Sequence, residues 1–405
     1  MNVTRRQNLA LLALIVIFLV AFAVRIYALD AQSMWIDEGV THDLAMRTMD
    51  DSARRVASAV HVPLYFWTMH LWIGVAGDSV FTMRFVSVAF SLLTVALAYA
   101  LGRKLFGITA GLAAAAFIAL NTFSIYYAQE MRMYAMLSAV AGGALWFYIR
   151  FIQHLRWRDG VILAILNTMG TLTHYTFAFF MVAQGVMAVL WMAFIGYRAL
   201  RARSGLDIAA GWRALWPTLW RYTAVNLLWL LLYTPWILGG GPSRIGIHPN
   251  ISPAVPLEQL LREIQGWLAF GRTYEQNMGG MGIAVYLLLI FGLLIQPKAR
   301  RDAWTWWKML LPVAWVLVML AVYLYLELYL RYMRFLLPAQ LAFALWMGRG
   351  VWVLWHLQTR HQESWTRYLP KAAAAMAVVG LLFNMSNGLD PLYNDPQHQR
   401  DNYKA

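Results

Sequence analysis

Residues 9–29 read LALLALIVIFLVAFAVRIYAL, an apolar run that is long enough to cross the hydrocarbon core of a bilayer as one helix. It is longer than the apolar core of a secretory signal peptide, which favours an uncleaved first span. The same composition continues through the chain, because 61% of the 405 residues are hydrophobic and only 13% are charged. This balance excludes an ordinary soluble domain and predicts an all-α polytopic membrane protein.

Working outward from this first run, charged residues, Gly and Pro divide the rest of the chain into further apolar stretches. The eleven predicted spans are Leu9–Leu29, Val80–Leu101, Thr109–Ala128, Tyr134–Ile152, Val161–Thr173, Phe177–Tyr197, Tyr222–Leu238, Met281–Gln296, Met309–Leu326, Phe335–Trp355 and Ala372–Asn384. A twelfth apolar run, Val62–Ala76, is too short to cross a bilayer comfortably. We expect it to lie at the membrane interface.

The charges indicate how the chain is oriented. The chain contains 33 Lys and Arg residues against 19 Asp and Glu, and 20 of the basic residues lie in the N-terminal segment and in alternate loops. By the positive-inside rule these segments are cytoplasmic, so the N-terminus is inside and an odd number of spans places the C-terminus outside. The basic residues are spread over six loops and form no single stripe, which argues against nucleic-acid binding. Cysteine is absent, which excludes disulfides, thiolate metal sites and cysteine nucleophiles.

Two outer loops are much longer than the others. The first covers residues 30–79 and contains the amphipathic stretch Thr41–Val60, and the second covers residues 239–280 and contains Leu257–Phe270 with apolar residues at helical spacing. We expect both stretches to be helices on the outer membrane surface. Long loops in a compact membrane bundle are usually functional.

The first loop contains the strongest candidates for chemistry. Asp37 and Glu38 lie just beyond the first span, where partial desolvation would make a carboxylate a stronger proton acceptor, and two adjacent carboxylates are also a candidate site for a divalent cation. The alternative is an ordinary solvated acidic turn. His61 precedes Pro63 at the start of the predicted interfacial helix, where a histidine is more often structural.

Other ionisable residues lie at the outer ends of later spans. Gln129, Glu130, Arg132 and Tyr134 join the third and fourth spans, where a polar cavity is a better environment for them than lipid, with interfacial snorkelling as the alternative. A further group comprises His174, Tyr175, Arg331, Tyr332 and Arg334, with Arg84 as a weaker case. An outer arginine needs an anionic partner, either a lipid phosphate or a local acid such as Glu327.

Several common motifs are missing. The chain has neither a phosphate-binding loop after Gly239–Pro242 nor a dinucleotide fingerprint, and it has no His-Glu-x-x-His pair for zinc. The residues therefore leave two kinds of function open: an enzyme, or a transporter or flippase that moves a lipid-linked precursor without breaking a bond.

The motifs in their order resemble the membrane glycosyltransferases of the GT-C superfamily. The motifs are Trp35-x-Asp37-Glu38, His61-x-Pro63-Leu64-Tyr65, Met83-Arg84-Phe85, Gly102-Arg103-x-Leu105-Phe106-Gly107, Gln129-Glu130-x-Arg132-x-Tyr134 and Arg331-Tyr332 through Pro338. The branch they resemble includes protein O-mannosyltransferases, lipid A aminoarabinose transferase and rhizobial lipopolysaccharide core transferases, similar to glycosyltransferase family 39. The family's His-Pro-Pro is His61-Val62-Pro63 here.

The resemblance implies a GT-C fold for residues 1–388 and a short outer tail, 389–405, that looks like the opening of a soluble domain. It also implies a multi-pass protein of the bacterial inner membrane that transfers a sugar from a polyprenyl-phosphate donor to an extracytoplasmic glycan, lipid or protein. Asp37 would be the general base, with Glu38 as its orienting neighbour or metal contact and no other cofactor than a divalent cation. The donor phosphate would be bound by Arg132, Arg331 and Arg334, and the sugar or acceptor by His61, Glu130 and His174.

Overall fold

The computed structural model describes residues 3–200, 205–241, 255–277, 279–294, 303–357 and 366–399, and every regular element within these ranges is a helix. The helices of the first half are α1 (Val3–Ile26), α2 (Ile36–Met46), α3 (Met49–Ala57), α4 (Leu64–Ala76), α5 (Val80–Leu105), α6 (Ile108–Leu120), α7 (Thr122–Ala128), α8 (Tyr134–His154), α9 (Trp157–Thr173) and α10 (Phe177–Leu200). Those of the second half are α11 (Gly205–Leu238), α12 (Leu257–Ala269), α13 (Tyr274–Asn277), η2 (Gly279–Met281), α14 (Gly282–Gly292), α15 (Ala303–Tyr325), η4 (Leu330–Leu336), α16 (Leu337–His356), η5 (Thr366–Tyr368), α17 (Leu369–Asn387), α18 (Leu389–Asn394) and η6 (Pro396–His398).

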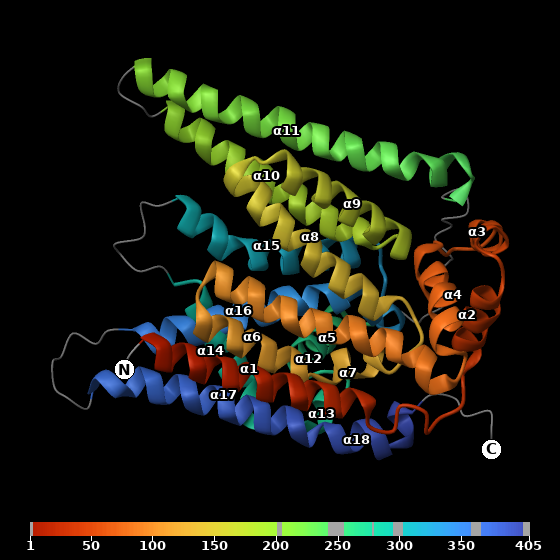
Figure 1. Cartoon of the computed structure of the whole chain (residues 1–405). Helices are drawn as coiled ribbons and strands as arrows, with labels where there is room; N and C mark the ends of the chain where they lie inside the picture. Colours follow the sequence, from red (N-terminus) through yellow and green to blue (C-terminus); the bar gives the residue numbers. More distant parts are fainter. Residues whose placement is uncertain are drawn as a thin grey trace.

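The long helices run side by side, and the short helices α2, α3 and α4 gather at one end of the bundle (Figure 1). Each predicted span overlaps one helix, or the pair α6 and α7, and the largest difference is α11, which begins at Gly205 and not at Tyr222. By length and apolar composition, six of the described helices could cross a membrane, or seven if α6 and α7 form one bent span. The all-α polytopic architecture is therefore confirmed, whereas the count of eleven spans stays a prediction.

The predicted span Thr109–Ala128 is not one straight helix. It breaks at Asn121 into α6 and α7, whose axes are bent by 60°. Asn121 has extended backbone angles, and its side-chain oxygen accepts a hydrogen bond from the backbone N–H of Phe123 at 2.9 Å, so one residue ends α6 and caps α7. Hydropathy did not predict the bend because the segments on both sides of it are apolar.

Arg25, in the last turn of α1, supports this bend. Its side chain is fully buried, and all five of its N–H groups donate hydrogen bonds of 2.8–3.1 Å, to Ser91 Oγ, Ala21 O, Ala119 O, Ile118 O and Ser124 Oγ. Ile118 and Ala119 belong to the last turn of α6, where backbone carbonyls have no helical N–H partner. The guanidinium therefore satisfies these carbonyls and places a positive charge at the negative end of the α6 dipole.

The amphipathic stretch Thr41–Val60 forms two helices, α2 and α3, that are separated at Arg47 and Thr48. Thr48 caps α3, because its Oγ1 accepts a hydrogen bond from the N–H of Asp51 at 3.3 Å. The predicted interfacial run Val62–Ala76 contains α4, and the predicted helix Leu257–Phe270 contains α12.

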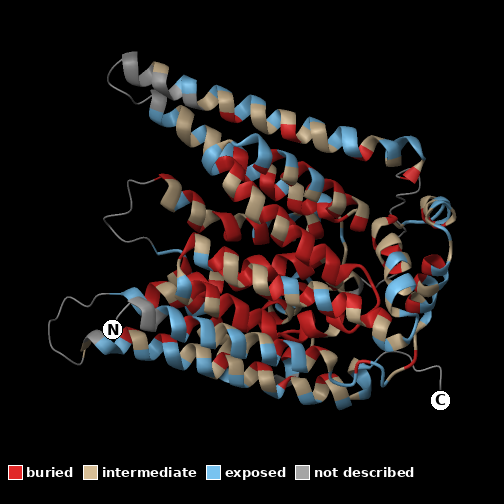
Figure 2. Ribbon diagram, in the orientation of Figure 1, coloured by how far each residue is buried: buried red, intermediate tan, exposed pale blue. Residues whose placement is uncertain are grey.

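The buried residues concentrate in the middle of the bundle, whereas α1, α10, α11 and α17 carry many exposed ones (Figure 2). Within its most apolar window, 78% of α8 is buried, against 11% of α1. The exposed side chains of α1 include Leu9, Leu11, Leu12 and Leu19, as expected of a helix that faces lipid. In the core, α5 and α6 cross closely at Gly102 and Gly111, since a Cβ on Gly102 would lie 2.7 Å from the Cα of Gly111.

Candidate active site

The predicted acidic pair begins α2. Trp35 precedes the helix in an extended conformation, and Asp37 and Glu38 lie in its first turn, where the helix dipole favours negative charge. Adjacent helical residues point in different directions, and the two carboxylates consequently meet different environments: the Asp37 side chain is 35% exposed, whereas that of Glu38 is fully buried. Only Asp37 is accessible to another molecule.

Glu38 forms a bidentate ion pair with Arg84 of α5. Arg84 Nη2 donates to Glu38 Oε2 at 2.6 Å and Nε donates to Oε1 at 2.9 Å, and Oε1 also accepts the backbone N–H of Met131 at 2.8 Å. The remaining N–H groups of Arg84 donate to the backbone carbonyls of Leu29, Gln32 and Ser33. All five donors are used within the protein, and Arg84 joins α2 to the segment after α1 and, through Glu38, to the loop before α8. Arg84 also lines a cavity of about 200 Å³, and its contact with substrate stays a prediction.

Asp37 contacts Arg132 from that loop. Arg132 Nη2 lies 3.9 Å from Asp37 Oδ2, and Nη1 donates to Asp37 O at 3.3 Å and to Thr41 Oγ1 at 3.2 Å. Arg132 is buried, and its Nε has no hydrogen-bond partner within the described part of the chain. Asp37 and Arg132, which are 95 positions apart in the sequence, thus lie side by side, and the Nε–H of Arg132 is available to donate a hydrogen bond to a ligand.

Two predicted histidines lie near these charges. Burial lowers the pKa of His61 to about 4, and the charges of Arg132 and Arg334 lower it further against the opposing effect of Asp37. His174, directly after α9, has its pKa lowered to about 3 by burial, with contributions from His61, Arg334 and Arg132. The N–H of Thr176 donates to His174 Nδ1 at 3.2 Å, which assigns the proton of the neutral ring to Nε2. Both imidazoles are therefore neutral donors and acceptors.

An aromatic group surrounds His174. Its ring lies 4.7 Å from that of Phe335 and 5.9 Å from that of Tyr134, and the guanidinium of Arg334 lies 5.5 Å from the centre of the Tyr134 ring. Tyr332 stacks on Phe335 at 5.2 Å. Arg334 is half-buried, and its Nε has no hydrogen-bond partner among the described residues. The structure thus brings Tyr134, His174, Tyr332 and Arg334 together.

Three predicted site residues have other surroundings. The hydroxyl of Tyr175 donates to the carbonyl of Gly241 at 2.8 Å and accepts a hydrogen bond from Trp236 Nε1. The side-chain amide of Gln129 donates to the carbonyls of Tyr27 and Arg25, so it anchors the end of α1. The backbone of Arg331 belongs to η4, but its side chain lies outside the part of the chain that the structure describes.

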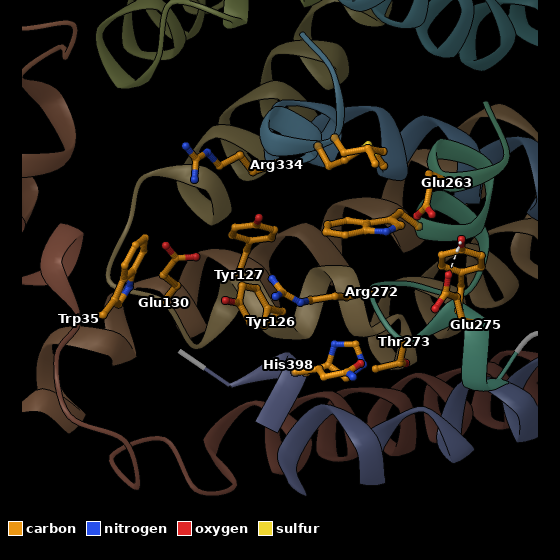
Figure 3. Close-up of a pocket in the computed structure, with 15 residues that line it drawn as sticks. Trp35, Tyr126, Tyr127, Glu130, Glu263, Arg272, Thr273, Glu275, Arg334 and His398 are labelled. Carbon is orange, nitrogen blue, oxygen red and sulfur yellow. Dashed lines mark hydrogen bonds between the residues drawn. The ribbon is translucent and has the colours of Figure 1, made fainter. Parts of the chain in front are cut away.

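A cavity beside these residues has a volume of about 430 Å³ (Figure 3). Two predicted residues line it, Glu130 and Arg334. The other lining residues are Trp35, Tyr126, Tyr127, Glu263, Trp267, Arg272, Thr273, Tyr274, Glu275, Leu330, Met333, Gln397 and His398. Asp37 is not among them, although its neighbour Trp35 is, and the indole Nε1 of Trp35 is a buried donor without a described partner.

Sequence reasoning identified the second long loop but missed the residues that this loop contributes to the cavity. Arg272 follows α12, and its guanidinium lies 4.0 Å from the centre of the Tyr126 ring and 5.9 Å from that of Trp267. Neither α12 nor α7 suggests this contact by its pattern, because the two elements are far apart in sequence. The unusual length of this loop was the available indication.

Asp37 and Glu38 do not together provide two ligands for the predicted divalent cation. Both oxygens of Glu38 already accept hydrogen bonds from Arg84. Within the described ranges, no group of three or more His, Asp or Glu side chains is arranged to hold a metal ion. Asp37 alone of the pair is exposed enough to contact one.

Comparisons with known proteins agree with this description. The family model for dolichyl-phosphate-mannose-protein mannosyltransferase matches residues 60–203. Two crystal structures of ArnT from Cupriavidus metallidurans share the fold, each with a TM-score of 0.56: the apo structure has 15% sequence identity and the structure bound to undecaprenyl phosphate 14%, and both comparisons cover 93% of this chain and 76% of ArnT. No curated protein matched the chain. The resemblance that the motifs indicated thus agrees with both comparisons: this chain is a multi-pass membrane protein with the ArnT fold, and its residues 60–203 match the model of the protein mannosyltransferase family.

Proposed function

We propose that this chain is a membrane glycosyltransferase that transfers a sugar from a polyprenyl-phosphate donor to a glycan, lipid or protein on the extracytoplasmic side. Two comparisons support the donor class. The matched family is described by a dolichyl-phosphate-linked sugar, and one of the two ArnT structures holds undecaprenyl phosphate. Residues 1–388 would form the catalytic transmembrane unit, with eleven spans and the N-terminus in the cytoplasm of a bacterial cell.

The observation that carries the proposal is a set of buried donors without acceptors beside an accessible carboxylate. Trp35 Nε1, Arg132 Nε and Arg334 Nε have no described hydrogen-bond partner, and Trp35 and Arg334 line the cavity. Leaving a buried donor unpaired costs about 1–3 kcal/mol, so such groups are usually completed by a ligand or by water. A phosphate has several strong acceptor oxygens and matches guanidinium geometry.

The proposed reaction needs one proton acceptor and one anion site. The acceptor hydroxyl attacks the anomeric carbon, its proton passes to Asp37, and the bond between the anomeric carbon and the phosphate oxygen breaks. The departing polyprenyl phosphate keeps the electron pair of that bond. Because a phosphate leaves readily as an anion, it needs charge stabilisation more than protonation. Arg132 and Arg334 would supply it, together with Arg331, and Glu38 and Arg84 would hold Asp37 in place.

The neutral polar groups around this site suit sugar hydroxyls. At neutral pH His61 can donate and accept one hydrogen bond, and His174 can donate one from Nε2, since burial lowers their pKa values to about 4 and about 3 and Nδ1 of His174 already accepts the N–H of Thr176. Glu130 and the aromatic rings of Tyr134 and Tyr332 lie near Arg334. We propose these residues as contacts to the sugar or the acceptor, and Gln129 and Tyr175 as residues that support them.

Asp37→Asn tests the proposal. Membranes containing the full chain would be supplied with undecaprenyl phosphate carrying radiolabelled hexoses or pentoses, and both transfer to the membrane acceptor and release of undecaprenyl phosphate would be measured. Loss of a general base is expected to slow transfer about 10²- to 10⁴-fold. Asp43→Asn is the matched control, because Asp43 lies on the same helix and pairs with Arg47 at the surface.

Two outcomes would contradict the proposal. Full activity of Asp37→Asn would remove Asp37 as the base. If the wild-type protein consumes no donor of the panel but moves the labelled lipid across vesicle membranes, the chain is a flippase and not a transferase.

A further inference from the structure

The C-terminal segment Leu389–Gln399 packs on the bundle as α18 and η6 and closes one side of the site. Tyr393 anchors it: the hydroxyl donates to the carbonyl of Val24 in α1, and the ring packs edge-on against that of Tyr27 at 4.9 Å. Asp395 caps η6 by accepting the N–H of Gln397 at 2.9 Å. These contacts hold residues 396–399 in a defined position beside the cavity.

His398 in this segment lies between two cavities. It lines the main cavity of about 430 Å³ and also a second one of about 200 Å³, which is formed by the segment after α1 and by α18. Tyr126 of α7 is the other residue that lines both. Figure 3 shows the imidazole of His398 on the wall of the main cavity, across from Arg334 and near Arg272.

The surroundings of His398 suit a neutral, hydroxyl-rich group. Partial burial and the charge of Arg272 lower its pKa, against the opposing effects of Asp395 and Glu275, so the ring is neutral above its usual titration range. A neutral imidazole offers one donor and one acceptor. Trp267 and Tyr126 supply aromatic surface to the cavity lining, and Thr273 adds a hydroxyl.

We propose that His398 binds the sugar of the polyprenyl-phosphate donor, while Arg334 on the opposite wall binds its phosphate. This inference rests on the proposed function. A cavity of this volume, at the lower end of the range for small-molecule sites, suits the headgroup and leaves the prenyl chain in the bilayer. The C-terminal segment then determines which sugar is accepted, because it forms the wall that the sugar faces.

Binding of two kinds of lipid, without and with a sugar, to the purified full chain in detergent tests this assignment. The probes are undecaprenyl phosphate and undecaprenyl phosphate carrying mannose, glucose or galactose, each at equilibrium with the protein. His398→Ala is expected to weaken binding of the best sugar-bearing lipid about fivefold, the value of one hydrogen bond, and to leave undecaprenyl phosphate binding unchanged. His398→Gln keeps a donor and an acceptor and should recover part of the loss. Arg334→Ala should weaken binding of both lipids.

Asn394→Ala is the control, because Asn394 is an exposed residue of α18 that lines neither cavity. If Asn394→Ala reproduces the effect of His398→Ala, or if His398→Ala weakens both lipids equally, His398 is not a sugar contact. If the wild-type protein binds and turns over a sugar-bearing lipid and His398→Ala binds it equally well, only this inference fails. If the wild-type protein binds neither lipid, the proposed function fails with it.

Discussion

Glu38 and Arg84 are opposite charges in a place that water does not reach. Neither side chain is more than 1% exposed, and the guanidinium also holds three backbone carbonyls of the segment between α1 and α2. Desolvation offsets much of the Coulomb energy that such a pair gains, so the pair adds little net stability. Its main effect is to fix the positions of the neighbouring residues. Asp37 precedes Glu38, and Arg132 follows Met131, whose N–H binds Glu38. One buried pair therefore sets the position of the two residues that we assign to chemistry.

Glu38→Gln should unfold the protein more easily. Removing one partner of a buried pair leaves an uncompensated charge, which costs about 3–5 kcal/mol. Asp43→Asn breaks a surface pair with Arg47 and should cost at most about 1 kcal/mol. Tryptophan-fluorescence melts in detergent would compare the two variants, and equal melting temperatures would show that Glu38 has no special structural role.

His61 and His174 predict how stability depends on pH. Their folded-state pKa values, about 4 and about 3, lie below the ordinary value of 6.5. Below pH 6.5 the unfolded chain binds protons at these two histidines while the folded chain does not. The free energy of unfolding therefore decreases as the pH is lowered from 6.5, down to about pH 4 for His61 and about pH 3 for His174. The double variant His61→Gln with His174→Asn keeps polar groups but cannot titrate. The melting temperature of this variant should vary less between pH 7 and pH 4 than that of the wild type. If the two proteins show the same pH dependence, the lowered pKa values of His61 and His174 do not control stability.

At the scale of elements, the break between α6 and α7 directs the chain toward the cavity. α7 carries Tyr126 and Tyr127, which both line it, and the loop after α7 carries Glu130 and Arg132. If α7 continued along the axis of α6, Tyr126 and Tyr127 would not line the cavity. Because Arg25 satisfies the carbonyls that the break exposes, the first span and the bend form one structural unit.

Arg25→Met should destabilise the protein by about 3 kcal/mol, because at least two buried carbonyls lose their donor. Arg158→Met is the control, since Arg158 is exposed at the start of α9. Activity should fall together with stability, because α7 loses its fixed orientation. The same melts and the transfer assay provide both readouts, and a variant that melts like the wild type would show that Asn121 alone maintains the bend.

At the scale of the whole molecule, the start of α1 and the C-terminal helix α18 lie toward opposite ends of the bundle (Figure 1), which is the arrangement expected for the predicted odd number of spans. The absence of cysteine makes the orientation testable in intact cells. Single substitutions Asp50→Cys and Asp78→Cys should react with a membrane-impermeant thiol reagent, because both residues are exposed in the first outer loop. Arg158→Cys should react only after the membrane is permeabilised. The reverse labelling pattern would place the proposed active site in the cytoplasm.

The sequence by itself determined the helical class, the apolar helices, the helices within the two long loops and the resemblance to a glycosyltransferase family. These properties depend on composition, on local periodicity and on short motifs, all of which are read within a few neighbouring residues. It also drew attention to Asp37, Arg132, His174 and Arg334 as polar residues at the outer ends of spans, where lipid would be a costly neighbour.

Only the tertiary structure decided how these residues meet. Asp37 and Glu38 are adjacent in sequence, yet one is accessible and the other is buried against Arg84, which separates a candidate base from its support. The roles of Arg25, Arg272 and His398 could be identified only from their contacts across the bundle. Such contacts join positions far apart in the chain, and no local pattern encodes them because they arise from how whole helices pack.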